Sequence, residues 1–299
     1  MRERVKATMK ILTGVVGFVA ALIAIYQFIP ETPDVDIRLV PEADPVVLSA
    51  ELIASGRPVV ADTLVVAQPL ASPGSLYVVT NHLSFGGQGS LRGTNIVILA
   101  TRISRGHIDV SGDVSTSSGA AGSGAGSILI AAARVDGTII DASGGDGAEG
   151  TSGAPGRPGR DGDCAGFGGW VGASDGGNGA DGGNGGAGGS GGTITLLLSE
   201  SDGFPEPAVV GGEGGSPGKG GGGGRGGRGC TGLGGSQRSH PPGRNGIDGR
   251  PGQDGAPGAL ISRRVRFEVV RTVLENVDLT DGSALATAVE QLEVQHGIL

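Results

Sequence analysis

Two aspartates, Asp109 and Asp141, occupy equivalent places in a repeated segment and are the one pair of acids suited to joint chemistry. Each begins the sequence Asp-x-Ser-Gly, and paired carboxylates on adjacent strands are the groups that cleave polysaccharides. Alternatively, each aspartate accepts a hydrogen bond from its own backbone in a turn, which is the interpretation we prefer. We therefore predict no catalytic residues and no enzyme, with a polysaccharide-binding or polysaccharide-cleaving β-helix protein of the cell envelope as the alternative.

The two cysteines, Cys164 and Cys230, are the other candidate pair. They are 66 residues apart (230 − 164), which is also the interval between two repeated strand segments. Equivalent places on adjacent elements would bring their Cα atoms within the range of a disulfide, so we predict that bond. It requires an oxidising compartment. The alternative is two free thiols that share a position through duplication of the repeat.

The remaining candidates for metal or cofactor binding do not have the required spacing. Lys219 is followed by a glycine, so it does not belong to a phosphate-binding loop. The histidines are scattered, without the intervals typical of metal ligands. We predict no metal and no cofactor. The histidines are His82, His107, His240 and His296.

Apolar segments that return along the chain must position these residues. Ile96–Ile103 resembles Ile128–Val135, and further copies open at Thr193 and Ala259. The intervals are 32, 66 and 66 residues (128 − 96, 193 − 127 and 259 − 193). Apolar strands at fixed intervals, with no helical pattern between them, predict stacked parallel rungs. We predict an all-β fold, a parallel β-solenoid over residues 95–271 with a β cap over residues 46–94.

Glycine recurs at every third position in two insertions, residues 145–192 and 211–258. A period of three is that of a polyproline-II helix, whose bare side can approach a neighbour closely. We predict two hairpin arms with limbs of the polyproline/polyglycine-II type. Gly-Gly-x triplets prevail in the second and third limbs, which predicts central places for them and a spatial order equal to the sequence order.

The repeat Ser127–Gly145 and the triplets of Gly153–Gly162 and Gly249–Gly258 resemble a family of bacterial surface proteins. These are the glycine-rich, collagen-like β-helix repeat proteins of the adhesin-like kind, and the resemblance covers about residues 95–270. The arms resemble the bundled polyglycine-II helices of the glycine-rich antifreeze protein of snow fleas. The resemblance implies surface exposure and carries over no catalytic residue.

The first residues predict a membrane anchor. Residues 1–10 are basic, residues 11–29 are apolar over nearly the ~20 residues that span a bilayer, and residues 30–45 form an acidic spacer. This order predicts an uncleaved transmembrane helix in the inner or plasma membrane, with a cytoplasmic N-terminus and a periplasmic or extracellular bulk. Small residues at intervals of four could pack against another helix, namely Thr13, Gly17 and Ala21.

The C-terminal segment predicts a last strand over Leu260–Thr272 and a helix over Ser283–His296, within a cap of residues 272–299. Taken together, the sequence predicts a structural or adhesive protein that is held in the lipid bilayer by residues 11–29 and presents a stiff glycine-rich surface. We expect a protein or glycan partner, with an oligomer possible. The net charge of −8 does not favour a nucleic acid.

Overall fold

The chain divides into two units, Met1–Ile37 and Arg38–Leu299. All the residues that the structure describes belong to the second unit, so the elements below are those of this unit. The computed structural model describes residues 38–162, 173–199, 205–229 and 239–296.

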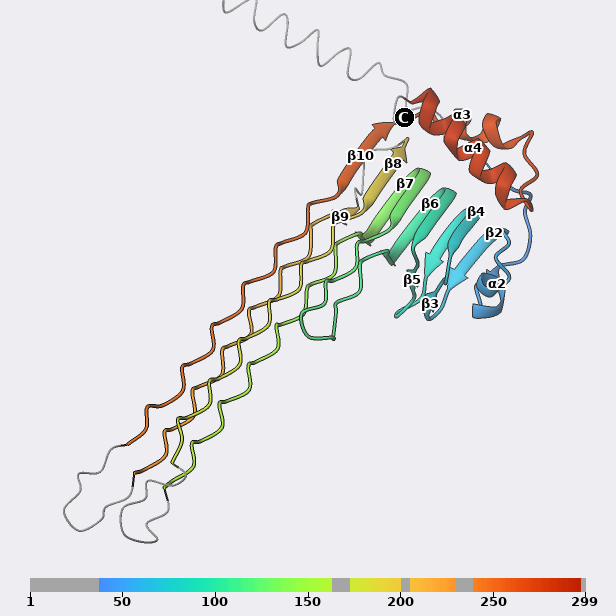
Figure 1. The fold of residues 1–299 in the computed structure, drawn as a ribbon. Helices are drawn as coiled ribbons and strands as arrows, with labels where there is room; N and C mark the ends of the chain where they lie inside the picture. Colours follow the sequence, from blue (N-terminus) through green and yellow to red (C-terminus); the bar gives the residue numbers. More distant parts are fainter. Residues whose placement is uncertain (1–37, 163–172, 200–204, 230–238, 297–299) are drawn as a thin grey trace, which may run out of the picture. The chain divides into compact units, whose positions relative to one another are not determined.

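The strands form one 10-stranded sheet, and the pairs within it are parallel. Its order is β1-β2-β4-β6-β7-β8-β10, while β3, β5 and β9 pair at the side (Figure 1). The strands are β1 (Val46–Val47), β2 (Val59–Val66), β3 (Pro69–Ala71), β4 (Ser75–Phe85), β5 (Ser90–Arg92), β6 (Asn95–Asp109), β7 (Ser127–Asp141), β8 (Thr193–Leu198), β9 (Glu206–Ala208) and β10 (Ala259–Arg264).

The predicted register of the repeated segments is confirmed. Ile96 in β6 pairs with Ile128 in β7. Thr193 in β8 pairs with Ser127 on one side and with Ala259 in β10 on the other. A slip of one residue would turn every apolar side chain to the opposite face of the sheet, so the repeated pattern determines the pairing.

The long strands β6 and β7 bend around an apolar core. Arg105 in β6 and Gly137 in β7 both have positive φ angles, 40° and 57°, and paired residues flank both positions. Side chains on either side of the bend, such as Ile98 and Ile108, lie in one buried cluster. The bend thus allows a single strand to line two sides of the same core.

Helices cover part of the sheet. α3 (Phe267–Leu274) contacts β7, and α4 (Gly282–Gln295) contacts α3. Figure 1 shows the two helices together beside the strands. Their apolar sides are buried, as Phe267 and Leu285 are almost inaccessible to solvent. A short third helix, α2 (Ala50–Ala54), precedes β2.

The C-terminal prediction is partly wrong. β10 ends at Arg264, and the residues predicted to continue the strand instead form α3 from Phe267 onward. The helix predicted over Ser283–His296 is confirmed as α4, which begins at Gly282 and ends at Gln295. The Asp281 side chain accepts the Ser283 N–H at 2.9 Å and so caps the helix start.

The prediction of an all-β solenoid is wrong, because the sheet is open and helices accompany it. A solenoid would require each turn to return through further strands and close a wall. After β7 the chain instead leaves the sheet in glycine-rich segments, whose backbones pair with one another. The strands therefore stack as predicted, but they do not close into a coil.

The prediction of a single-pass membrane protein is not supported. In the part of the chain that the structure describes, no helix is long and apolar enough to cross a membrane. The helices α2, α3 and α4 have 5, 8 and 14 residues, fewer than the about 20 that span a bilayer. The localisation derived from an anchor loses its support with it. The predicted span of residues 11–29, with Thr13, Gly17 and Ala21, lies outside the described residues.

Candidate functional site

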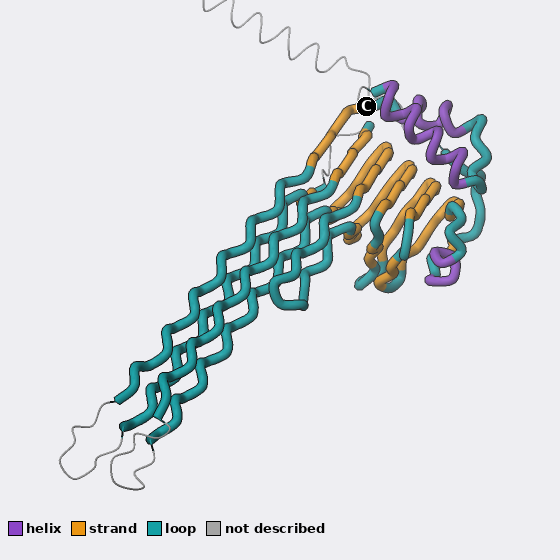
Figure 2. The backbone as a smooth tube through the Cα atoms, in the orientation of Figure 1, coloured by secondary structure: helices purple, strands orange, loops and turns teal. Residues whose placement is uncertain are grey.

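Four glycine-rich limbs extend from the sheet and lie side by side (Figure 2). They carry a glycine at every third position, as a polyproline-II-type helix allows. Such a helix has no internal hydrogen bonds, so its N–H groups must find partners in neighbouring limbs. We name the limbs A (143–162), B (173–192), C (209–229) and D (239–258).

Consecutive limbs are antiparallel and joined by backbone hydrogen bonds. The Gly183 N–H of limb B donates to the Thr151 carbonyl of limb A at 2.7 Å. The Gly218 N–H of limb C donates to Gly183 at 2.9 Å, and the Gly249 N–H of limb D donates to Gly218 at 2.9 Å. Equivalent bonds recur at every third residue, so the limbs support one another over the described length.

Limbs two apart in the sequence are parallel and also bonded. The Gly153 N–H of limb A donates to the Lys219 carbonyl of limb C at 2.7 Å, and Gly182 of limb B donates to Ile247 of limb D at 2.8 Å. Limbs A and C thus form one layer, and limbs B and D form another. The predicted order holds for consecutive limbs but misses the two layers. The collagen-like interpretation is wrong, because limbs of one chain pair with each other.

The adjacent glycines Gly221 and Gly222 show that contact with a neighbouring limb determines which positions must lack a side chain. A Cβ atom built on Gly221 would collide with the carbonyl oxygen of Ala154 in limb A. One built on Gly222 meets no atom within 4 Å, because that position points outward. Limbs B and C each bond to three other limbs, which explains their Gly-Gly-x triplets.

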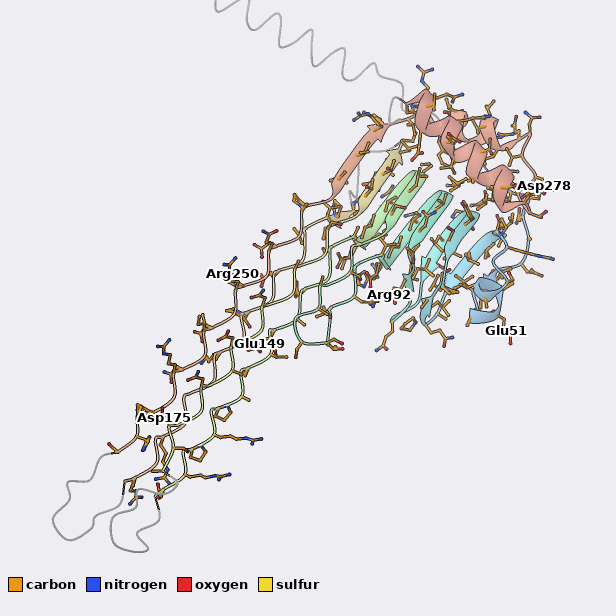
Figure 3. All side chains as sticks on the ribbon, viewed as in Figure 1. Glu51, Arg92, Glu149, Asp175, Arg250 and Asp278 are labelled. Carbon is orange, nitrogen blue, oxygen red and sulfur yellow. The ribbon has the colours of Figure 1, made fainter. Side chains whose placement is uncertain are left out.

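Every third residue of each limb points away from the bundle and is exposed (Figure 3). The A/C face consists of every third residue from Asp146 to Asp161 and from Glu213 to Arg228. The B/D face consists of every third residue from Asn178 to Ser190 and from Arg244 to Ala256. Side chains on both faces can vary without altering the backbone bonds of the limbs.

Asparagine and aspartate side chains on these faces bridge neighbouring limbs. On the A/C face the Asp161 Oδ1 atom accepts the Arg228 N–H at 2.8 Å, and this bond lowers the pKa of Asp161, with the charges of Arg225 and Arg228 adding to the effect. On the B/D face the Asn184 Oδ1 atom accepts the Arg250 N–H at 2.8 Å. The same arrangement occurs for Asp146 with Glu213, Asn178 with Arg244 and Asp181 with Ile247.

Removing one of these bridges should expose a single amide. In Asn184→Ala we expect the Arg250 amide to exchange about 2- to 10-fold faster, the equivalent of the ~0.5–1.5 kcal/mol of one hydrogen bond. Ala187 provides the matched control, because it lies opposite Gln253, whose N–H has no acceptor among the described residues. Ala187→Asn should slow exchange at Gln253. Hydrogen exchange resolved by NMR measures both, and an unchanged Arg250 rate would contradict the bridge.

The candidate acids Asp109 and Asp141 are brought together but are already bonded. They pair in register between β6 and β7. Their Oδ1 atoms accept the N–H groups of Ser111 and Ser143 at 2.7 and 2.8 Å. The Arg92 guanidinium lies 3.7 Å from Asp109. The turn interpretation therefore accounts for both side chains. A cavity of about 280 Å³ lies elsewhere, between residues 38–41 and α3.

The structure does not establish a geometry for the other predicted sites. Cys164 and Cys230 lie outside the described residues, so the disulfide stays a prediction. Two residues before each cysteine in the sequence, the Gly162 N–H donates to the Arg228 carbonyl at 2.9 Å, which sets the ends of limbs A and C at one level. Among the residues that the structure describes, no group of three or more acidic or histidine side chains is placed to hold a metal ion.

Sequence reasoning missed the outward rows, although their signal was present. Asp or Asn occupies the third place of several triplets, such as Gly176-Gly177-Asn178, at intervals of three. Such a side chain can accept a bond from a neighbouring backbone. The regular interval predicted a neighbour on the same side, but not which limb provides it.

Comparison with known proteins does not extend these observations. No protein-family model matches the chain. No curated protein and no solved structure matches it either. The resemblance to adhesin-like repeat proteins therefore stays a prediction, and the function is argued from the geometry of the bundle.

Proposed function

We propose that this is a non-enzymatic interaction protein, whose limbs A–D form a stiff bundle that binds a protein or glycan partner through its side-chain faces. One observation carries the proposal. The recurring glycine N–H groups of the limbs are hydrogen-bonded to neighbouring limbs, so the outward side chains project at fixed intervals from a rigid backbone. A preorganised surface binds at a lower entropic cost than a flexible one.

The composition of the faces supports the same proposal. The limbs contain hardly any buried apolar side chains; Ala148 is an exception. Their outward residues are instead charged, amide, hydroxyl, proline or small, with Ile247 exposed to 74%. Large structures without an apolar core are costly to order, because glycine loses much conformational freedom on folding. Because its side chains point outward, an extended bundle is suited to binding a partner on its surface rather than to enclosing a substrate.

The polysaccharide-cleaving alternative receives no comparable support. Asp109 and Asp141 each bond to a serine N–H two residues further on, as turn residues do. The cavity lined by residues 38–41 and α3 does not include either acid. A glycan partner stays within the proposal as a ligand that is bound and released unchanged.

Photo-crosslinking in the native cells tests the proposed function. We expect a photoreactive side chain at Gly222, which points outward, to capture a specific partner. The same group at Leu52 in α2, which is 40% exposed, provides the control and should not capture it. Capture from Leu52 but not from Gly222 would contradict binding by the bundle. Release of reducing ends from a polysaccharide, abolished in Asp141→Asn, would contradict a non-enzymatic role.

A further inference from the structure

Charges on the A/C face are separated along its length. The end near the sheet carries the acids Asp146, Glu149 and Glu213. The far end carries Arg225 and Arg228, with Lys219 near the middle. One acid, Asp161, lies at the basic end, where it accepts the backbone N–H of Arg228 and lies 3.9 Å from the guanidinium of Arg225. The two ends of one face therefore have complementary charge.

We propose that a second copy of this protein binds the A/C face in the antiparallel direction. An isologous interface requires one surface to be complementary to itself after a two-fold rotation. A face that is acidic at one end and basic at the other meets this requirement only when the two copies run in opposite directions. The inference rests on the proposed function, since it names one partner for the same bundle.

The charges also determine where the two-fold axis crosses the face. An axis between Lys219 and Gly222 places Glu213 opposite Arg228 of the second copy. It also places Lys219 opposite Gly222, the outward position of this row that has no side chain and no atom within 4 Å. The long lysine side chain thus meets an open place.

Limb A follows the same axis. Gly153 and Gly156 donate to Lys219 and Gly222, so the axis crosses limb A at this level, between Ser152 and Pro155. Asp146 then lies opposite Asp161 of the second copy, which is the one unfavourable pair. Both carboxylates accept a backbone N–H at 2.8 Å, and the Arg225 guanidinium lies 3.9 Å from Asp161, so this repulsion is moderated.

The area is that of a specific interface. Limb A from residue 144 to residue 162 spans roughly 55 Å at about 3.1 Å per residue. The two rows of the face, at roughly 5 Å spacing, give a width of about 10 Å. The product is roughly 550 Å² per copy, or about 1,100 Å² in total, which is just above the about 1,000 Å² that a specific interface should exceed.

The edge formed by limb D offers less to a second copy. Side chains of this limb accept N–H groups of limb C, which would otherwise be available for pairing. These bonds join Asp254 to Gly214, Asp248 to Gly220 and Asn245 to Gly223, at 2.7–2.8 Å. Two bundles therefore pair through the side chains of a face, and the A/C face is the self-complementary one.

A charge exchange tests the pairing in the full chain by sedimentation equilibrium. We expect dimers at about 0.05 M salt that weaken at about 0.5 M, where charges are screened. Glu213→Arg or Arg228→Glu alone should weaken dimerisation at least ~10-fold, because symmetry alters two contacts at once. The double variant should restore it. Arg250→Glu on the B/D face is the control and should leave it unchanged.

Spin-label distances test the direction. A label at Gly222 should lie about 10 Å along the bundle from its counterpart, and a label at Glu213 about 45 Å, since the separation grows from the axis at ~3.1 Å per residue. Equal separations at both positions would mean parallel copies and would overturn the proposal. Monomers at every salt concentration, or a double variant that fails to recover, would also overturn it.

A different partner gives a different pattern. If Arg228→Glu abolishes binding to alginate, an anionic polysaccharide, while Glu213→Arg has no effect, the basic end binds an anionic polymer and self-pairing is refuted. In that case the proposed function survives, because the face still binds a partner. Loss of self-pairing together with an absence of crosslinks from Gly222 would refute both.

Discussion

Gly221→Ala should disrupt the far half of the glycine-rich bundle, whereas Gly222→Ala should leave it intact. The new methyl group at position 221 would occupy the place of the Ala154 carbonyl oxygen in limb A, and that oxygen belongs to a backbone that cannot rotate away. Overpacking of this kind costs about 1–3 kcal/mol even in a core that can adjust. At Gly222 the methyl group enters solvent, so we expect a change within about 0.5 kcal/mol.

Hydrogen exchange of the limb amides separates the two variants. Gly221 donates to Ala180 at 2.8 Å and Gly246 donates to Gly221 at 2.8 Å, so displacement of limb C exposes amides on two limbs. Faster exchange at these amides in Gly221→Ala, with the sheet unaffected, is the expected result. Equal effects of the two substitutions would contradict the assignment of inward and outward positions.

The sequence predicted which strands pair because its apolar pattern repeats. Ile96 and Ile128 begin segments with a similar apolar pattern, and the sheet aligns them. It did not predict that the sheet stays open, since closure depends on where the chain goes after Asp141. That path is set by backbone bonds between distant limbs, such as Gly144 to Val210 at 2.8 Å, which no local pattern encodes.

The helix α3 was missed because its pattern is ambiguous. From Val265 the residues alternate, which indicates a strand, but Phe267, Val270 and Leu274 also fall at helical intervals. The structure buries these three side chains together, with accessibilities of 1%, 0% and 4%. Packing against the neighbouring elements decides between two periods that the sequence satisfies equally.

The limbs were predicted from the period of three, and the layers were not. Gly-Gly-x triplets indicate two bare sides, and limbs B and C do contact limbs on several sides. A threefold helix presents its residues on three sides. Whether the limbs form one row or two layers depends on which of these sides each neighbouring limb contacts. The acceptors Asn178 and Asn184 show that direction only once limb D is placed beside limb B.

Shortening all four limbs by two matched triplets should leave the bundle folded. Each deletion removes two full turns of the threefold helix, so every later residue keeps its direction, inward glycines stay inward, and all four limbs lose the same levels. We expect a bundle shorter by about 19 Å at about 3.1 Å per residue, which small-angle scattering measures. The deleted residues are 152–157, 178–183, 218–223 and 244–249.

Deletion of Ser152 alone should have the opposite outcome, although it removes far less of the chain. Every later residue of limb A then moves up by one position, which is a third of a turn of the helix. Ala154 thus takes the place of Gly153, and Arg157 takes the place of Gly156. The Gly153 place faces limb B, where a Cβ atom collides with the Ala180 carbonyl oxygen. We expect the far half of limb A to detach, and the limb amides beyond Thr151 to lose their protection from exchange. A folded bundle in the Ser152 deletion, or an unfolded one after the matched deletions, would show that the period of three does not hold these limbs together.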